Sequence, residues 1–314
     1  MASPKDAIRQ PAATGGERVG AFLVFLSALF WSFGGAIARY IETPDVWAVV
    51  FWRSAWAAIF IFGFMLWRDG ARGALRAVRG MGLPGFAVAC CFAVAATSFV
   101  VALSYTTVAN ILLMQAGVPL LAALLAWVVF RERVTTSTWL AIAAVIIGVA
   151  VMVSESLTGE VSPMGDGLAL LIACVFATAT VITRRFSDVR MTPATGLATI
   201  FAAAFASTQA GTLAVSASDM GLLFAFGVLN LGLGLALFAT GARLIPAALT
   251  ALLGTFEPIL GPVWVWLFHG EIPSGRTMIG GAIVVAALLV YLAIEFRRQM
   301  LPQRPGVTGN SAPL

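Results

Sequence analysis

Ten long apolar segments follow one another along the chain, and they constrain its fold more than any other feature of the sequence. A helix that crosses a bilayer needs about 20 predominantly apolar residues. The segments cover residues 20–39, 46–67, 83–103, 108–130, 138–153, 167–183, 194–215, 222–240, 247–268 and 278–294. An open sheet cannot cross lipid, because its edges leave backbone groups unpaired. We therefore predict an all-α integral membrane protein with ten transmembrane helices.

The composition excludes several other classes of protein. Hydrophobic residues make up 60% of the chain and charged residues 11%, whereas soluble domains average about 25% charged residues. The net charge is only +5, and the basic residues are scattered through short loops, so none of them forms a stripe that could bind nucleic acid. His269 is the single histidine. A His/Cys metal cluster and a His-based catalytic triad are therefore excluded, and we expect neither an enzyme nor a metal site.

Lysine and arginine are distributed unevenly between the two sides of the predicted bundle. With the N-terminus in the cytoplasm, sixteen of the 19 basic residues fall in cytoplasmic segments, Arg39 and Arg276 fall outside, and Arg53 lies within a span. Cytoplasmic loops of membrane proteins carry an excess of Lys and Arg, so both termini are predicted to be cytoplasmic. Residues 1–17 and 301–314 are rich in Pro, Gly, Ala and polar residues, and we expect disordered cytoplasmic tails there.

The two halves of the sequence resemble each other. Residues 109–132 align with residues 248–271 at a constant offset of 139, so Pro119 meets Pro258 and Glu132 meets Glu271. The alignment predicts that the chain contains an internal repeat.

A weaker similarity joins residues 28–39 to residues 173–184. The two matches together predict two five-helix repeats, over 18–155 and 164–300. Because five is odd, the second repeat should enter the membrane upside down, with Glu132 at the cytoplasmic face. Inverted repeats around a central cavity are typical of alternating-access transporters, although a duplication can also build a static scaffold.

Several motifs resemble one known group of transporters. They are the region around Trp31, Pro44 to Arg53 at the start of the second span, the string Ala102-Leu103-Ser104-Tyr105-Thr106, the Ala…Pro…Glu strings of spans four and nine, and Gly148. The pattern resembles the drug/metabolite transporter superfamily in its ten-helix EamA-type form. Among its branches the chain looks most like the bacterial amino-acid exporters of the YddG type.

The resemblance implies a secondary transporter without an organic cofactor. It would export amino acids, including aromatic and other neutral ones, or similar small metabolites across the bacterial inner membrane by alternating access. The carboxylate of Glu257 makes protons a candidate coupling partner. An uncoupled, channel-like facilitator and an exporter of drugs or other metabolites remain alternatives. Phosphorylated substrates need clustered intramembrane cations, whereas Lys5 is the only lysine and lies in the tail.

Two ionisable residues lie well inside the spans, Arg53 and Glu257. A charge at the bilayer centre is costly, so each should face protein or water. Either can contact a zwitterionic substrate, or Arg53 can simply bind neighbouring carbonyls or Glu257. Pro119 and Pro258 interrupt equivalent spans and remove helix hydrogen bonds there. They can act as helix hinges or as static kinks.

Uncharged polar and aromatic residues of the spans are the remaining candidates for lining a substrate cavity. With Glu257 included, the candidate cavity residues are Trp31, Ser32, Tyr105, Asn110, Gln115, Phe176, Thr178, Asn230 and Glu257. The same residue types also bond neighbouring helices in membranes, and both interpretations stay open. Four tryptophans near span ends are interpreted as interface anchors, namely Trp47, Trp67, Trp139 and Trp264.

Overall fold

A computed structural model describes residues 15–131, 134–154, 162–186 and 188–300. Within these ranges every regular element is helical. The elements are α1 (Gly15–Ser32), α2 (Gly34–Tyr40), α3 (Val46–Gly80), α4 (Gly82–Ala102), α5 (Val108–Ala116), α6 (Val118–Phe130), α7 (Thr136–Val153), α8 (Pro163–Arg185), α9 (Thr192–Gln209), α10 (Ala217–Phe224), the π-helix η3 (Ala225–Leu233), α11 (Gly234–Gly241), α12 (Ala247–Gly254), α13 (Phe256–His269) and α14 (Gly275–Met300).

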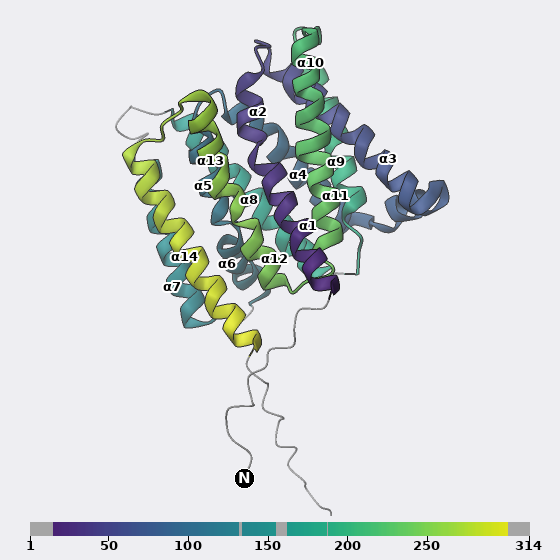
Figure 1. The fold of residues 1–314 in the computed structure, drawn as a ribbon. Coiled ribbons are helices and arrows are strands. Elements are labelled where there is room, and N and C mark those ends of the chain that lie inside the picture. The colour runs from purple at the N-terminus through teal and green to yellow at the C-terminus, as the bar shows by residue number, and fades with distance from the viewer. Residues whose placement is uncertain (1–14, 132–133, 155–161, 187, 301–314) are drawn as a thin grey trace, which may run out of the picture.

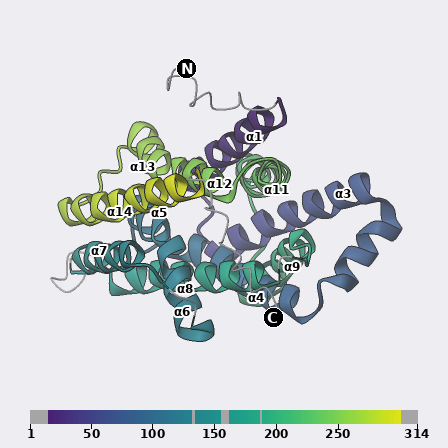
Figure 2. The same cartoon turned by 90° about the horizontal axis from the view of Figure 1, so that it is seen from below.

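The helices form one bundle whose long axes run mostly up and down in Figure 1. The first turn of α1 and the last turns of α14 lie at the same end of the bundle, whereas α2 and the start of α10 lie at the opposite end (Figure 1). Figure 2 shows the same bundle from below, with α3 at its right-hand edge. We call the end that carries α2 the outer end, because the predicted orientation places it outside the cell.

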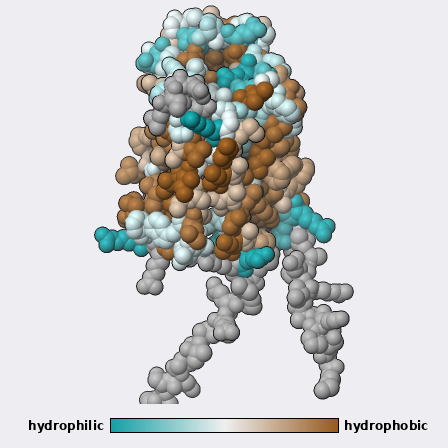
Figure 3. Space-filling model, turned by 90° about the vertical axis from the view of Figure 1, so that its left-hand side faces the viewer, coloured by the Kyte–Doolittle hydropathy of each residue, from teal (hydrophilic) through white to brown (hydrophobic). Residues whose placement is uncertain are grey.

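On the face shown in Figure 3, apolar side chains form a broad band across the middle of the molecule, with hydrophilic residues above and below it. Ile59, Val129 and Leu140 are 64%, 63% and 69% exposed. Exposed apolar area of this extent is rare in soluble monomers and is typical of contact with lipid.

Eight helices or continuous helical runs of the described residues are long and apolar enough to cross a membrane. A ninth span is obtained if α5 and α6, which bend by 45° at their junction, count as one. The one predicted span that is not among these nine, 194–215, corresponds to α9. This helix fails the test because its threonines, Pro193 and Gln209 lower its mean hydropathy. The prediction of ten spans is therefore confirmed only in part. Nevertheless α9 is a helix of 18 residues that packs against α3 and α4.

Some predicted boundaries shift in the structure. The helix α1 begins at Gly15, so the predicted tail 1–17 is three residues too long, and the remaining tail residues lie outside the described ranges. The predicted span 46–67 continues as α3 to Gly80, across a kink where Gly70 adopts φ 68°. Glycine tolerates this left-handed conformation because it has no Cβ. Glu132, which matches Glu271 at the repeat offset, lies outside the described residues.

Helices of the first half pair with helices of the second half in a reciprocal way. The helices α3 and α9 pack against each other, as do α7 and α14. The first helix of each half packs mainly against the other half: α1 contacts η3, α11, α12 and α13, whereas α8 contacts α4, α5 and α6. Between α7 and α14 the backbones nearly touch, because a Cβ on Gly148 or on Gly280 would overlap the carbonyl oxygen of the other.

The helices that carry the two predicted hinge prolines are broken. A junction at Gly117 separates α5 from α6, and a junction at Thr255 separates α12 from α13. Pro119 and Pro258 each lie in the first turn of the new helix, where a missing N–H costs no helix hydrogen bond. The breaks therefore lie just before the prolines.

Helix ends also recur at the spacing of 139 residues. The residue after α6, Arg131, and the residue after α13, Gly270, both adopt a left-handed conformation, with φ of 54° and 66°. The hydroxyl of Thr135 accepts a hydrogen bond from the amide of Thr138 at the start of α7, and Ser274 does the same for Thr277 at the start of α14. The similarity between the two sequence segments thus extends to their helix caps.

Candidate functional site

A set of polar and aromatic contacts surrounds the end of α1 inside the bundle. The Ser32 hydroxyl donates to the Leu29 carbonyl at 2.7 Å and accepts from the Trp264 indole nitrogen at 2.9 Å. The Trp264 ring also stacks on Phe33, with 4.8 Å between the ring centroids. The interpretation of Trp264 as an interface anchor is therefore wrong, because its N–H is engaged by a fully buried hydroxyl of α1.

Asn230 joins the π-helix η3 to the same end of α1. Its amide nitrogen donates to the carbonyls of Phe30 and Trp31 at 2.8 and 3.0 Å. Those carbonyls precede the break between α1 and α2 at Phe33, where regular helix bonding stops. The Trp31 ring packs against Phe238, with 5.4 Å between the centroids. One region therefore contains Trp31, Ser32 and Asn230. Within it, the side chain of Asn230 links η3 to α1 by hydrogen bonds.

Arg53 is buried on α3 and makes no ion pair with Glu257. One guanidinium nitrogen donates to the Ala96 carbonyl at 3.3 Å, and the guanidinium carbon lies 4.1 Å from the centroid of the Phe226 ring. This is a cation–π contact. Among the described residues the half-buried carboxylate of Glu257, in the first turn of α13, has no hydrogen bond or ion pair. The two intramembrane charges therefore lie in separate environments.

Three of the predicted cavity residues lie apart from these contacts. Gln115 precedes the α5–α6 break, and its buried amide nitrogen has no hydrogen-bond partner among the described residues. Phe176 packs against Phe92, with 5.6 Å between the centroids. Thr178 is exposed and donates to the Cys174 carbonyl in its own helix. The predicted cavity residues are therefore not brought together around a single described pocket.

Tyr105 and Asn110 line a pocket of about 370 Å³ at the outer end of the bundle. Its walls come from the α4–α5 loop, the ends of α2 and α7, and the first turns of α5, α8 and α14. The lining residues are Arg39, Leu103, Ser104, Tyr105, Thr106, Thr107, Asn110, Met152, Ser162, Asp166, Ser274 and Thr277. Most of them carry hydroxyl, amide or charged groups, so this is a polar pocket at the end of an apolar bundle.

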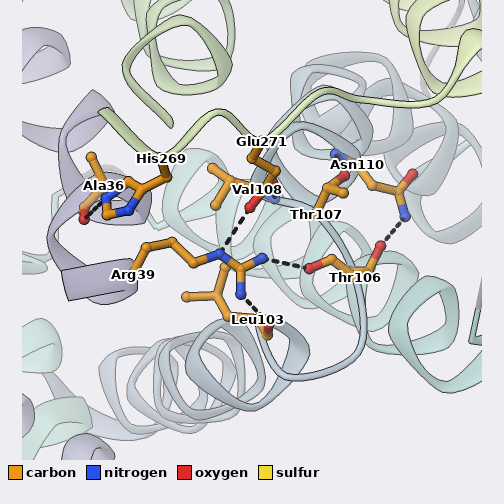
Figure 4. Close-up of polar contacts among 9 residues, drawn as sticks. All are labelled: Ala36, Arg39, Leu103, Thr106, Thr107, Val108, Asn110, His269 and Glu271. Atoms are coloured by element: carbon orange, nitrogen blue, oxygen red, sulfur yellow. Dashed lines mark hydrogen bonds and ion pairs between the residues drawn. The ribbon is translucent and has the colours of Figure 1, made fainter. Parts of the chain in front are cut away.

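An ion pair closes one side of this outer end (Figure 4). Arg39 Nε donates to Glu271 Oε2 at 2.9 Å, and its other two nitrogens donate to the carbonyls of Leu103 and Thr106 at 2.8 and 3.1 Å. Glu271 Oε1 accepts from the Val108 amide at 2.8 Å. We call Arg39, Glu271 and these three backbone partners the outer latch. It joins α2, the α4–α5 loop and the α13–α14 loop.

A second contact lies beside the outer latch. His269 Nε2 donates to the Ala36 carbonyl at 3.0 Å (Figure 4). The His269 ring also packs against Tyr40, with 4.3 Å between the centroids. The sequence had placed both Arg39 and Glu271 at the outer face, from basic-residue counting and from the repeat. Their pairing was missed, because nothing in the two distant segments indicates that they meet.

Asp166 is the other functional candidate that the sequence did not reveal. It is 3% exposed and lies in the first turn of α8. Asn110 donates to it at 2.5 Å. An acidic residue directly before the apolar segment 167–183 was the only available signal, and it looks the same as any residue at a helix start. No group of His, Cys, Asp and Glu within the described ranges has the arrangement of a metal site.

Comparison with known proteins agrees with this architecture. The EamA-like transporter family matches residues 18–154 and again residues 163–293. A curated relative, the "Uncharacterized transporter YwfM" of Bacillus subtilis (strain 168), is 25% identical over 214 residues, which cover 66% of this chain and 72% of the relative. A solved structure titled "Crystal structure of protein" aligns with a TM-score of 0.61 at 18% identity, over 90% of this chain and 99% of its own, and shows the fold alone.

The family match and the relative point to a transporter rather than an enzyme. The family covers both halves of the chain with one profile, and the helical, lipid-facing bundle is what such a protein requires. This chain belongs to the EamA-like transporter family.

Proposed function

We propose that the protein is a secondary transporter that exports amino acids or similar small neutral metabolites across the plasma (inner) membrane of a bacterium by alternating access. The observation that carries the proposal is the pair of broken helices, α5–α6 and α12–α13, at equivalent positions of the two family-matched segments. Transporters commonly bind substrate at such discontinuous helices, where backbone groups leave regular bonding.

The two halves act in this proposal as inverted repeats over 18–155 and 164–300. The reciprocal packing of α3 with α9 and of α7 with α14 supports a two-fold relation between them. The recurring caps at Arg131 and Gly270 support it as well. In alternating access one repeat rocks against the other, and the breaks before Pro119 and Pro258 serve as the hinges.

Polar groups next to the breaks are the proposed substrate contacts. Gln115 offers a buried amide donor without a partner among the described residues, and Glu257 offers a carboxylate. Trp31 and Phe176 supply apolar area from the first helix of each repeat. Glu257 is also the candidate for exchanging a proton against the substrate.

The chemistry of the intramembrane charges favours neutral or zwitterionic solutes over phosphorylated ones. A phosphate needs several converging cations. Arg53 already contacts the Ala96 carbonyl and the Phe226 ring, and Lys5, the only lysine, lies at the N-terminus. A YddG-like amino-acid exporter fits these constraints.

Flux into proteoliposomes tests the proposal, with a panel of amino acids, cationic drugs and sugar phosphates. We expect counterflow of one or more neutral amino acids and no flux of sugar phosphates. A proton ionophore separates coupled export from an uncoupled facilitator, because it collapses accumulation only in the coupled case. Transport confined to drugs or to sugar phosphates would refute the amino-acid assignment.

A further inference from the structure

The outer pocket contains two buried polar side chains, each with one oxygen that receives no hydrogen bond from the described residues. Asn110 and Asp166 are each 3% exposed. The Asn110 amide nitrogen donates to Asp166 Oδ1 and to Thr106 Oγ1, so both of its hydrogens are engaged. Two oxygens remain, Asn110 Oδ1 and Asp166 Oδ2. Both are buried, and neither receives a hydrogen bond from the described residues.

The remaining atoms are acceptors only, so the missing partner is a donor or a cation. Arg39 lines the same pocket, but its guanidinium donates to Glu271, Leu103 and Thr106, and no hydrogen bond or ion pair joins it to Asp166 or Asn110. A buried carboxylate without a counter-charge is unfavourable. No positively charged group of the described residues binds Asp166, so we expect its partner to come from a bound solute.

The size of the pocket favours an organic cation over a bare ion. Its volume is about 370 Å³, whereas one water molecule occupies about 30 Å³ in the liquid. Hydroxyl groups of Thr106, Thr107 and Thr277 line it beside Asp166, and they can accept the further hydrogens of an ammonium group.

We propose that Asp166 and Asn110 form an outer subsite that binds the primary ammonium group of a solute leaving the transporter. The identity of the solute as an amino acid rests on the proposed function, whereas the recognition of an ammonium group rests on this pocket alone.

Thr106 connects this subsite to the outer latch. Its hydroxyl accepts from Asn110, and its carbonyl accepts from Arg39 (Figure 4). The start of α8 packs closely against Thr106, because a Cβ on Gly165 would overlap Thr106 and the Tyr105 carbonyl. An ammonium group drawn to Asp166 therefore acts on the loop that holds the latch closed.

Protection of a reporter thiol tests the subsite without any transport assay. The reporter is Tyr105→Cys, which lines the pocket at a position that is 47% exposed, in full-length protein whose native cysteines are replaced. The probes are propylammonium, tetramethylammonium, which has no N–H to donate, and Na⁺. We expect propylammonium to slow thiosulfonate labelling in a saturable way, and the other two cations to leave it unchanged at equal concentration.

Asp166→Asn should raise the half-protecting concentration of propylammonium by about tenfold or more, because a hydrogen bond to a charged acceptor is lost. The matched control is Asp219→Asn. Asp219 is also buried towards the outer end, but the Glu42 amide and the Thr43 hydroxyl bind its two oxygens. This variant should retain the wild-type half-protecting concentration.

Several outcomes would overturn the inference: no protection by propylammonium, equal protection by Na⁺ or tetramethylammonium, or undiminished protection in Asp166→Asn. The amine series in the unsubstituted pocket remains decisive if Asp166→Asn fails to fold. Protection without amino-acid flux would leave the subsite standing and refute the proposed function, whereas flux without protection would do the reverse.

Discussion

Removing the charge of Glu271 should open the outer end of the molecule. Glu271 accepts hydrogen bonds from Arg39 at 2.9 Å and from the Val108 amide at 2.8 Å, and the side chains of Arg39 and Glu271 are 29% and 17% exposed. Glu271→Gln keeps an acceptor for Val108 but weakens the charge-assisted bond. At this exposure we expect a loss of about 1–2 kcal/mol, which shifts the equilibrium between latched and unlatched forms roughly 5–30-fold.

Labelling of a buried thiol measures this shift. Ala36→Cys is a small change at a position that is 3% exposed and whose carbonyl binds His269 beside the latch. We expect the thiol to react slowly from the outside, and faster by the same factor in Glu271→Gln. Glu42→Gln is the control, because this exposed outer carboxylate is not part of the latch. Unchanged reactivity in folded Glu271→Gln, or an equal increase in Glu42→Gln, would refute the role assigned to the latch.

Three further predictions concern other parts of the bundle. Trp264→Phe removes the indole donor to Ser32 and should lower the free energy of unfolding by about 1 kcal/mol, measured by thermal unfolding, whereas Trp266→Phe at a 54% exposed position should change it little. Gly280→Ala should separate α14 from α7 and destabilise the protein by about 1–3 kcal/mol; Gly275→Ala, which meets nothing within 4 Å, should not. Glu257→Gln should leave a folded protein that binds substrate but whose flux no longer depends on pH, and retained pH dependence would remove Glu257 from the coupling mechanism.

The sequence predicted the parts of the fold that depend on contact with lipid. Apolar length located most helices, and the prolines at 119 and 258 marked two real breaks in them. It also predicted α9, as the span 194–215, although the small and polar residues of this helix, which packs against α3 and α4, lower its hydropathy. A helix packed on protein needs less apolar surface than one facing lipid, so hydropathy alone identifies it poorly.

Polar contacts between distant segments were the least predictable feature. Arg39 meets Glu271 across 232 residues, and Asn110 meets Asp166 across 56. Each residue was visible in the sequence, but a pairing depends on how helices pack and not on local pattern. Trp264 illustrates the same limit. Its position near a span end predicted an anchor at the membrane interface, but α13 packs on α1, and the Trp264 indole donates to Ser32.

The sidedness of two equivalent helix starts tests the inverted repeat, and with it alternating access, most directly. Thr136 begins α7 and Gly275 begins α14 at the repeat spacing, and both positions are exposed. In a background without native cysteines, Thr136→Cys and Gly275→Cys are treated with a membrane-impermeant maleimide in intact cells and in inverted vesicles. The inverted repeat predicts that Gly275→Cys reacts only in cells and Thr136→Cys only in inverted vesicles. Reaction of both from the same side would contradict it.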